Sequence, residues 1–240
     1  MSRNIVITGG TSGIGYAIYK SLNNLDNNKI VIIARHSSQK KSLFSKEVLL
    51  IDADISNKID VDSAADKAIK YLGSIDILIN NAGISFPGPF LKATKEEIEK
   101  SITVNLLGPL YVTHSFLPYL IKQDNTIIVN ITSAAAENGI PGLSVYCASK
   151  FGLKGFSEAL RKEMAENKIR LIEISPGGVA TAIHNTLIER KGKESVKMEN
   201  ALDPKDVAAA VTYAINQPVN TSINEIQIRH SSLKMIGTYI

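Results

Sequence analysis

The sequence is poor in cysteine and in aromatic residues. Among its 240 residues there is one cysteine, Cys147, no tryptophan, and an aromatic content of only 6%. A single cysteine excludes an intramolecular disulfide framework and fits a reducing compartment. Cys147 directly follows a tyrosine on an expected helix, so it faces a different direction. We interpret it as a small packed residue and not as a nucleophile.

Long hydrophobic runs are also missing. No apolar run approaches the ~20 residues that a membrane helix needs, so we expect no membrane partner. Residues 1–4 lead directly into an apolar stretch without the pattern of a signal peptide, and we therefore expect a cytoplasmic protein. The formal net charge is only +4, and the cations are scattered. We expect a solvated, mildly basic surface and no nucleic-acid partner.

Patterns typical of metal sites and of hydrolases are absent as well. The four histidines lie far apart, and no Cys/His pair has ligand spacing, so no metal site is predicted. There is no Gly-x-Ser-x-Gly elbow, which argues against a Ser–His–Asp hydrolase. Linkers, internal repeats and low-complexity tracts are missing too. We therefore expect one domain spanning residues 1–240.

Short apolar runs alternate with longer segments of helical period along the chain. Most of the short runs are continuously apolar, as expected when helices cover both faces of a parallel sheet. Repeated strand–helix–strand units predict a doubly wound, Rossmann-like α/β fold with about seven parallel strands. The expected strands are 4–8, 29–34, 48–52, 75–80, 126–131, 170–175 and 224–228. The expected helices are 13–23, 58–72, 95–122, 145–167 and 204–216.

Two segments interrupt this alternation. Between the second and third strands only residues 36–47 are available, so any helix there is short. Between residues 176 and 203 runs a polar stretch without a strand, too long for an ordinary connection. Within it, residues 182–200 carry mixed apolar and basic side chains. We expect this part to be a lid over cofactor and substrate, with a permanently docked surface helix as the alternative.

A glycine-rich turn joins the first strand to the first helix. Glycines there allow a tight turn and let backbone N–H groups approach a pyrophosphate at the helix N-terminus. Ligands of open parallel sheets bind at the carboxyl ends of the strands, which is where this turn lies. The alternative for an isolated turn of this kind is a plain turn. The predicted cofactor contacts are Gly9, Thr11, Ser12, Gly13, Ile14 and Gly15.

The end of the second strand carries a cation where many NAD-binding proteins carry an acid. An acidic residue at this place holds the ribose 2′-hydroxyl, whereas an arginine accommodates a 2′-phosphate. The sequence reads Ala34-Arg35-His36, with no acid. Arg35 can stack on adenine and pair with phosphate through its planar fork. We therefore predict NADP as the cofactor; a solvated loop arginine is the alternative.

Tyr146 and Lys150 stand four residues apart on an expected helix and project from the same face. A phenol titrates near pH ~10, and a neighbouring ammonium lowers that pKa toward the working range of an acid–base catalyst. Ser133 follows the fifth strand and precedes Tyr146 by one loop. Strand end and helix can therefore bring a hydroxyl and a phenol together, although Tyr-x-x-x-Lys by itself occurs on many helices by chance.

Further motif residues occur in order along the chain. They are Asp54, Asn80-Asn-Ala-Gly83, Asn105 and Pro176-Gly177. Together with the glycine turn, Ser133 and Tyr146-x-x-x-Lys150 they are highly specific, and over nearly its whole length the sequence resembles the short-chain dehydrogenase/reductase family. The resemblance implies an oxidoreductase that transfers a hydride between a nicotinamide cofactor and a small carbonyl or alcohol substrate.

The resemblance also implies roles for individual residues. Tyr146 is implied to donate the proton to the carbonyl, and Ser133 to orient the carbonyl oxygen. Lys150 is implied to lower the pKa of Tyr146 and to hold the nicotinamide ribose, and Asn105 to support a proton relay through Lys150. Tyr146 and Lys150 are implied cofactor contacts as well. The others are Asp54 and Ile55 at adenine, Asn81, Ala82 and Gly83 on the adenosine side, and Pro176, Gly177, Val179 and Thr181 at the nicotinamide.

We expect NADPH-dependent reduction of a ketone or aldehyde to an alcohol by a homodimer or homotetramer, since in this family the helices corresponding to 95–122 and 145–167 form a dimer interface. An NAD-dependent alcohol or hydroxy-acid dehydrogenase is the alternative within enzymes. A non-catalytic NADP-sensing protein is the alternative from another class. The sequence departs from the family in the short segment after Arg35 and in residues 228–232, which lack a glycine pair.

Overall fold

A computed structural model describes residues 2–25, 27–181 and 201–232. In these residues seven parallel strands form one sheet in the order β3-β2-β1-β4-β5-β6-β7. The strands are β1 (Asn4–Thr8), β2 (Lys29–Ala34), β3 (Leu49–Asp52), β4 (Ile77–Asn80), β5 (Ile127–Ile131), β6 (Arg170–Pro176) and β7 (Glu225–Ile228). The predicted doubly wound fold is confirmed, and the expected strand ends are correct to within two residues.

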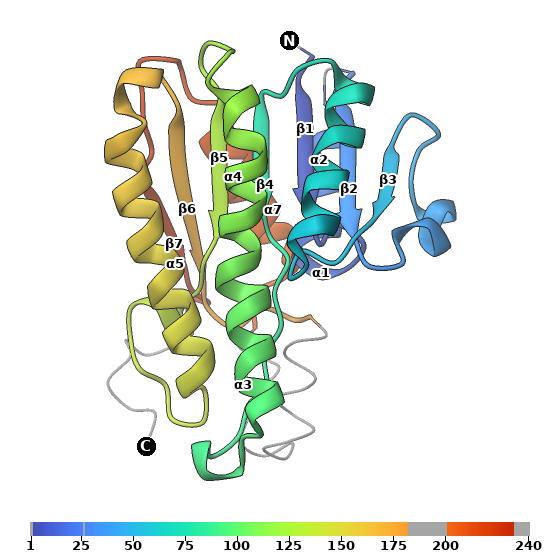
Figure 1. Ribbon diagram of the computed structural model, residues 1–240. Coiled ribbons are helices and arrows are strands. Elements are labelled where there is room, and N and C mark those ends of the chain that lie inside the picture. The colour runs from blue at the N-terminus through green and yellow to red at the C-terminus, as the bar shows by residue number, and fades with distance from the viewer. Residues whose placement is uncertain (1, 26, 182–200, 233–240) are drawn as a thin grey trace.

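Helices cover both faces of the sheet, as Figure 1 shows. On one face lie α1 (Gly13–Asn23) and α7 (Pro204–Ile215), and on the other α2 (Lys58–Leu72), α3 (Lys95–Ile102), α4 (Gly108–Leu120) and α5 (Ser144–Glu163). Successive strand residues alternate between two cores, because side chains of a strand point to opposite faces. Ile5 and Ile7 belong to the core under α1 and α7, whereas Val6 belongs to the core under α2, α4 and α5.

Strand order reverses beside β1. From β1 the chain adds β2 and β3 on one side, and then returns to place β4 through β7 on the other. Val6 pairs with Val31 of β2 and with Leu78 of β4, so the three strands are in register. Such a reversal leaves a crevice outside the carboxyl ends of the two diverging strands. The ends of β1 and β4, at the lower edge of the sheet in Figure 1, therefore mark the candidate site.

The predicted helix 95–122 is wrong as a single α-helix. Thr103–Leu107, between α3 and α4, forms a π-helical turn, and α4 ends at Leu120. Single π turns inside α-helices occur often at functional sites. The predicted helix 145–167 also ends early, at Glu163, because Lys168 takes a left-handed conformation with φ 55° after one 3₁₀ turn.

The segment between β2 and β3 is short, as expected, and forms only a 3₁₀ helix, Ser37–Leu43. The predicted lid, residues 182–200, lies outside the described residues. On either side of it, Val179 and Leu202 form an isolated parallel bridge. Among the helices of the described residues, none has the length and apolar character needed to cross a bilayer.

Candidate functional site

The glycine-rich turn is tightly packed against the end of β4. Gly9 has φ +67°, and a Cβ there would lie 2.8 Å from Ala82 Cα. A Cβ on Gly15 would lie 2.4 Å from both Asn81 Nδ2 and the Gly9 carbonyl oxygen. Real Cβ atoms do not make contacts this short, so the turn requires glycine at both positions. The predicted cofactor residues Gly9, Gly15, Asn81 and Ala82 are thus brought together.

The N-terminus of α1 is shaped to accept an anion. The Ser12 side chain makes no capping hydrogen bond, and the first turn of α1 carries no acidic residue. Orphan backbone N–H groups and the positive end of the helix dipole favour a phosphate at such a place. A Cβ on Gly13 would lie 3.1 Å from Thr181 Cγ2, so Thr181, which the resemblance implies at the nicotinamide, borders this turn. The residues present therefore fit a dinucleotide pyrophosphate.

Thr8 ties the turn to β4 through its side chain. Its hydroxyl accepts hydrogen bonds from the backbone N–H groups of Asn81 and Ala82, at 3.0 and 3.2 Å. The Asn81 Nδ2 group donates to the carbonyls of Thr8 and Gly9, at 3.0 and 3.2 Å. These contacts hold the two sides of the crevice in a fixed geometry.

Arg35 and Asp54 lie at the expected adenosine side of the crevice. Partial burial acts to raise the pKa of Asp54, but hydrogen bonds from Ser56 and the charge of Arg35 outweigh it and hold that pKa below its ordinary value. Ile55 is buried, and a Cβ on Gly108 would lie 2.7 Å from its Cδ1. The exposed Arg35 therefore lies near enough to Asp54 for their charges to interact, while the role of both residues at adenosine stays a prediction.

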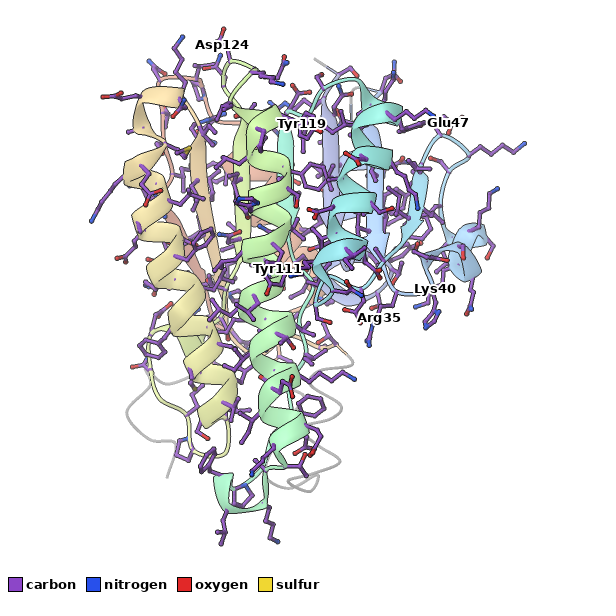
Figure 2. All side chains as sticks on the ribbon, in the orientation of Figure 1. Arg35, Lys40, Glu47, Tyr111, Tyr119 and Asp124 are labelled. Atoms are coloured by element: carbon purple, nitrogen blue, oxygen red, sulfur yellow. The ribbon has the colours of Figure 1, made fainter. Side chains whose placement is uncertain are left out.

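The short segment after Arg35 places a second cation that the sequence analysis missed. Lys40 Nζ donates to the Thr11 carbonyl of the glycine turn at 3.4 Å. Figure 2 labels Arg35 and Lys40 at the lower edge of the sheet, on the side of β2 and β3. Lys40 escaped notice because it lies five residues beyond Arg35 in a stretch with several lysines. Only the path of the 3₁₀ helix brings it to the turn.

Asp52 anchors this segment. Its carboxylate accepts hydrogen bonds from the Ser37 hydroxyl and from both the backbone N–H and the hydroxyl of Ser38. These bonds, that of the Ser38 hydroxyl first, lower the pKa of Asp52 to about 2. A carboxylate held in this way fixes the course of the chain immediately after Arg35.

Ser133, Tyr146 and Lys150 converge at the carboxyl end of β5. Ser133 caps a single 3₁₀ turn, and its hydroxyl accepts a hydrogen bond from Ala135 N. Lys150, only 4% exposed, donates from Nζ to the Ile131 carbonyl at 2.9 Å. The same Nζ lies 5.7 Å from the centre of the Tyr146 ring. The three predicted catalytic side chains are therefore neighbours.

The expected lowering of the Tyr146 pKa by Lys150 is wrong for this structure. Burial raises the pKa of the Tyr146 hydroxyl above its ordinary value, and a hydrogen bond with Ser133 offsets only part of this rise. Burial also lowers the pKa of Lys150 to about 8. The physical reason is that the Lys150 side chain is buried and the Tyr146 side chain partly buried, and burial disfavours the charged form of each group. Tyr146 thus holds its proton at neutral pH.

Asn105 lies in the π-helical turn and is fully buried. Its Oδ1 accepts a hydrogen bond from Ile84 N at 2.8 Å, and its Nδ2 donates to the Ile84 carbonyl at 2.9 Å. A Cβ on Gly83 would lie 3.3 Å from Asn105 Oδ1 and 3.9 Å from Lys150 Nζ. Asn105, Gly83 and Lys150 are therefore adjacent, while the relay role of Asn105 stays a prediction.

The residues predicted for the nicotinamide follow β6 directly. Pro176 ends that strand, and Gly177 N donates to the Ile228 carbonyl of β7 at 2.8 Å. Val179 is buried. A second group that the sequence analysis missed adjoins Gly177, namely Glu137, Ser175 and Arg229, which hydrogen bond to one another.

Replacing Lys150 with Met is expected to change how stability depends on pH. Because burial lowers the pKa of Lys150 from its ordinary value of 10.5 to about 8, the unfolded chain binds more protons than the folded chain between these values. The free energy of unfolding of the unsubstituted protein should therefore rise by about 3 kcal/mol relative to Lys150→Met across this interval. Denaturant titrations at several pH values measure the difference.

Lys154→Met, one turn further along α5, is the control. The Lys154 side chain is 24% exposed and pairs with Glu225, and its replacement should show no comparable rise with pH. A difference between the unsubstituted protein and Lys150→Met that stays constant with pH would contradict the lowered pKa of Lys150.

Comparison with known proteins agrees with this geometry. A family model described as short chain dehydrogenase matches residues 3–192. An uncharacterized oxidoreductase of Staphylococcus saprophyticus is 36% identical over 239 residues, with 95% of this chain and 96% of the relative covered. Another uncharacterized oxidoreductase, from Staphylococcus aureus, is 31% identical, with 93% of this chain and 95% of the relative covered.

Solved structures share the fold. The structure of 3-ketoacyl-(acyl-carrier-protein) reductase from Brucella melitensis complexed with NADH has a TM-score of 0.85 at 28% identity, with 95% of this chain and 96% of that chain covered. A metagenomic short-chain oxidoreductase in complex with NADP has a TM-score of 0.81 at 26% identity, with 97% of this chain and 99% of that chain covered.

Proposed function

Because the chain belongs to the short-chain dehydrogenase family, we propose that this oxidoreductase uses NADPH to reduce a ketone or aldehyde to an alcohol. The observation that carries the proposal is the convergence of Ser133, Tyr146 and Lys150 beside the crevice between β1 and β4. The phenol of Tyr146 is protonated at neutral pH, and burial raises its pKa further. A protonated phenol suits the reductive direction, in which a proton must be given to the substrate.

The residues of this chain have separate tasks in the proposed reaction. When bound, the cofactor supplies the hydride that adds to the carbonyl carbon. The Ser133 hydroxyl donates a hydrogen bond to the carbonyl oxygen and orients it toward Tyr146. Tyr146 Oη transfers its proton to that oxygen, which completes the alcohol. Lys150 binds the nicotinamide ribose with its ammonium and, lying next to the Tyr146 ring, supports the charge left after the proton is given.

The preference for NADPH over NADH rests on two cations beside the adenosine side. Arg35 is exposed at the end of β2, and Lys40 contacts the glycine turn. Both can approach a ribose 2′-phosphate, and the segment that carries Lys40 is held by Asp52. Among the structural relatives one binds NADP and another NADH, so these local cations carry the proposal.

We further propose that the protein forms a homodimer or homotetramer in the cytoplasm. Exposed apolar side chains occur just before α3 and on α5, where Phe90 is 61%, Leu91 96% and Phe151 46% exposed. A second copy of the chain would remove them from water, which is favourable in proportion to the apolar area buried. The single, buried cysteine suits a reducing compartment.

The test of this function is an absorbance assay with NADPH or NADH and a panel of ketones and aldehydes. Oxidation of NADPH that depends on a carbonyl substrate, and that is slower with NADH, is the expected result. Faster reaction with NAD and an alcohol would favour the NAD-dependent dehydrogenase instead. Tight NADPH binding without turnover of any substrate, in either direction, would favour a cofactor-sensing protein and contradict the proposed reaction.

A further inference from the structure

A partly buried ion pair joins the loop that carries Ser133 to the end of β7. Arg229 Nη2 donates to Glu137 Oε2 at 2.8 Å, and the two side chains are 24% and 17% exposed. Glu137 follows Ser133 by one 3₁₀ turn, and its N–H donates to the Ala134 carbonyl. Arg229 directly follows β7, in the stretch that lacks the glycine pair expected from the resemblance.

The same two side chains also hydrogen bond to Ser175, which precedes the predicted nicotinamide segment Pro176-Gly177. The Ser175 hydroxyl donates to Glu137 Oε1, while Arg229 Nη1 donates to the carbonyls of Ser175 and Ile228. Ser175 is 1% exposed and directly precedes Pro176-Gly177. A Cβ on Gly177 would lie 3.3 Å from Arg229 Cδ, so the arginine stem packs on this glycine. One guanidinium thus holds both the Ser133 loop and the predicted nicotinamide loop.

The far end of the Ser133 loop is held by the only cysteine. Ile140 N donates to Cys147 Sγ at 3.4 Å, and Cys147 Sγ lies 3.7 Å from the Asn138 carbonyl, to which it donates. Cys147 is 5% exposed and directly follows Tyr146. The loop between β5 and α5 is therefore held at two places, at Glu137 by the ion pair with Arg229 and at residues 138–140 by hydrogen bonds with Cys147. Loss of the Glu137–Arg229 ion pair should therefore make the Cys147 thiol more accessible to solvent.

We propose that Glu137 and Arg229 are a positioning pair, which holds Ser133 and the Pro176-Gly177 segment in the relative geometry that hydride and proton transfer require. Reactive groups must be held to within about 0.5 Å, and charge-assisted hydrogen bonds between partly buried groups supply such rigidity. Neither side chain touches the reacting atoms in this account. The expected effect of the pair on turnover rests on the proposed function. Its expected effect on the conformation of the loop does not.

The variants Arg229→Met and Glu137→Gln test the pair. Arg229→Met keeps an apolar stem over Gly177 but removes the ion pair together with the Nη1 hydrogen bonds to Ser175 and Ile228. Glu137→Gln keeps an acceptor for Ser175 and removes chiefly the charge of the pair. The first readout is the rate at which a thiol reagent labels Cys147, the only cysteine in the chain. Both variants should be labelled about tenfold faster, because the loop opens locally more often. This readout needs neither cofactor nor substrate.

The second readout separates kcat from KM. Loss of positioning should lower kcat on the order of threefold to tenfold, a modest part of what misplacement of reacting groups can cause, while KM changes less. Arg229→Lys, which keeps the charge, should recover part of both effects. The matched control is Lys154→Met, because the Lys154–Glu225 pair is of similar exposure, 24% and 29%, and joins α5 to β7. It should change neither the labelling rate nor kcat.

Each outcome decides the proposal. Labelling of Arg229→Met and Glu137→Gln at the rate of the unsubstituted protein would overturn it, whether or not a substrate has been found. Faster labelling with unchanged kcat would show that the pair holds the loop without positioning the reaction, which also overturns it. If Arg229→Met does not fold, Glu137→Gln and Arg229→Lys decide in its place. Absence of turnover in the unsubstituted protein would count against the proposed function, while the labelling result would still report on the loop.

Discussion

Replacing Tyr146 with Phe is expected to lower turnover by about 10²–10⁴-fold, the range typical for loss of a general acid–base group. The phenol is protonated at neutral pH and burial raises its pKa further, and phenylalanine keeps the ring while removing that proton. The ring also lies next to Lys150, so its retention preserves the local packing. Steady-state rates with NADPH and a carbonyl substrate measure the effect, and NADPH fluorescence should show a nearly unchanged dissociation constant.

Tyr213→Phe is the matched control for this substitution. Tyr213 is 61% exposed on α7 and takes no part in the candidate site, so its loss of a hydroxyl should leave turnover unchanged. Turnover of Tyr146→Phe equal to that of the unsubstituted protein, with the chemical step rate-limiting, would refute Tyr146 as the proton donor. Reduced NADPH binding instead would assign Tyr146 to the cofactor site.

Replacing Arg35 with Ala is expected to weaken NADPH binding by about tenfold to a hundredfold, with little effect on NADH. A charge-assisted hydrogen bond to a phosphate is worth roughly 1.5–3 kcal/mol, which corresponds to this range in the dissociation constant. Only NADPH carries the 2′-phosphate, so the two cofactors should respond differently. Fluorescence titrations of both cofactors with the unsubstituted protein and the variant measure it.

Lys29→Ala is the control for the loss of a positive charge. Lys29 is exposed at the start of β2, the end of the strand opposite to Arg35, and should contribute only a weak, salt-screened attraction. An equal loss of affinity for NADPH and NADH in Arg35→Ala would contradict a contact with the 2′-phosphate. It would indicate that Arg35 stacks on adenine, which both cofactors share.

The order of strands and helices could be predicted from the sequence because local patterns specify it. Continuous apolar runs such as that of β2 indicate strands buried on both faces, and the strand ends were correct to within two residues. Interruptions of regular helices were harder to predict from the sequence. The π turn holds Asn105 in hydrogen bonds to the backbone of Ile84, and α5 ends before a 3₁₀ turn and the left-handed Lys168. No helical period reveals either feature.

For the candidate site, too, some features could be predicted from the sequence and others could not. The sequence identified Ser133, Tyr146 and Lys150, and the structure places them together. The sequence did not reveal that Lys40 lies beside Thr11. Nor did it reveal the ion pair of Glu137 and Arg229, which lie 92 positions apart in the chain. Nor could the sequence give the direction of the Tyr146 pKa shift, since burial of that side chain raises its pKa.

The sequence by itself determined the doubly wound fold, the glycine turn and the Tyr146–Lys150 pair, because each follows from local residue patterns, and the ordered motifs carried the resemblance that implied the catalytic residues. Only the tertiary structure decided how much water surrounds Tyr146 and Lys150, and which distant side chains meet at Ser175 and Gly177. The physical reason is that desolvation and ion pairing depend on distances through space. Those distances arise only when strands remote in sequence come to lie side by side.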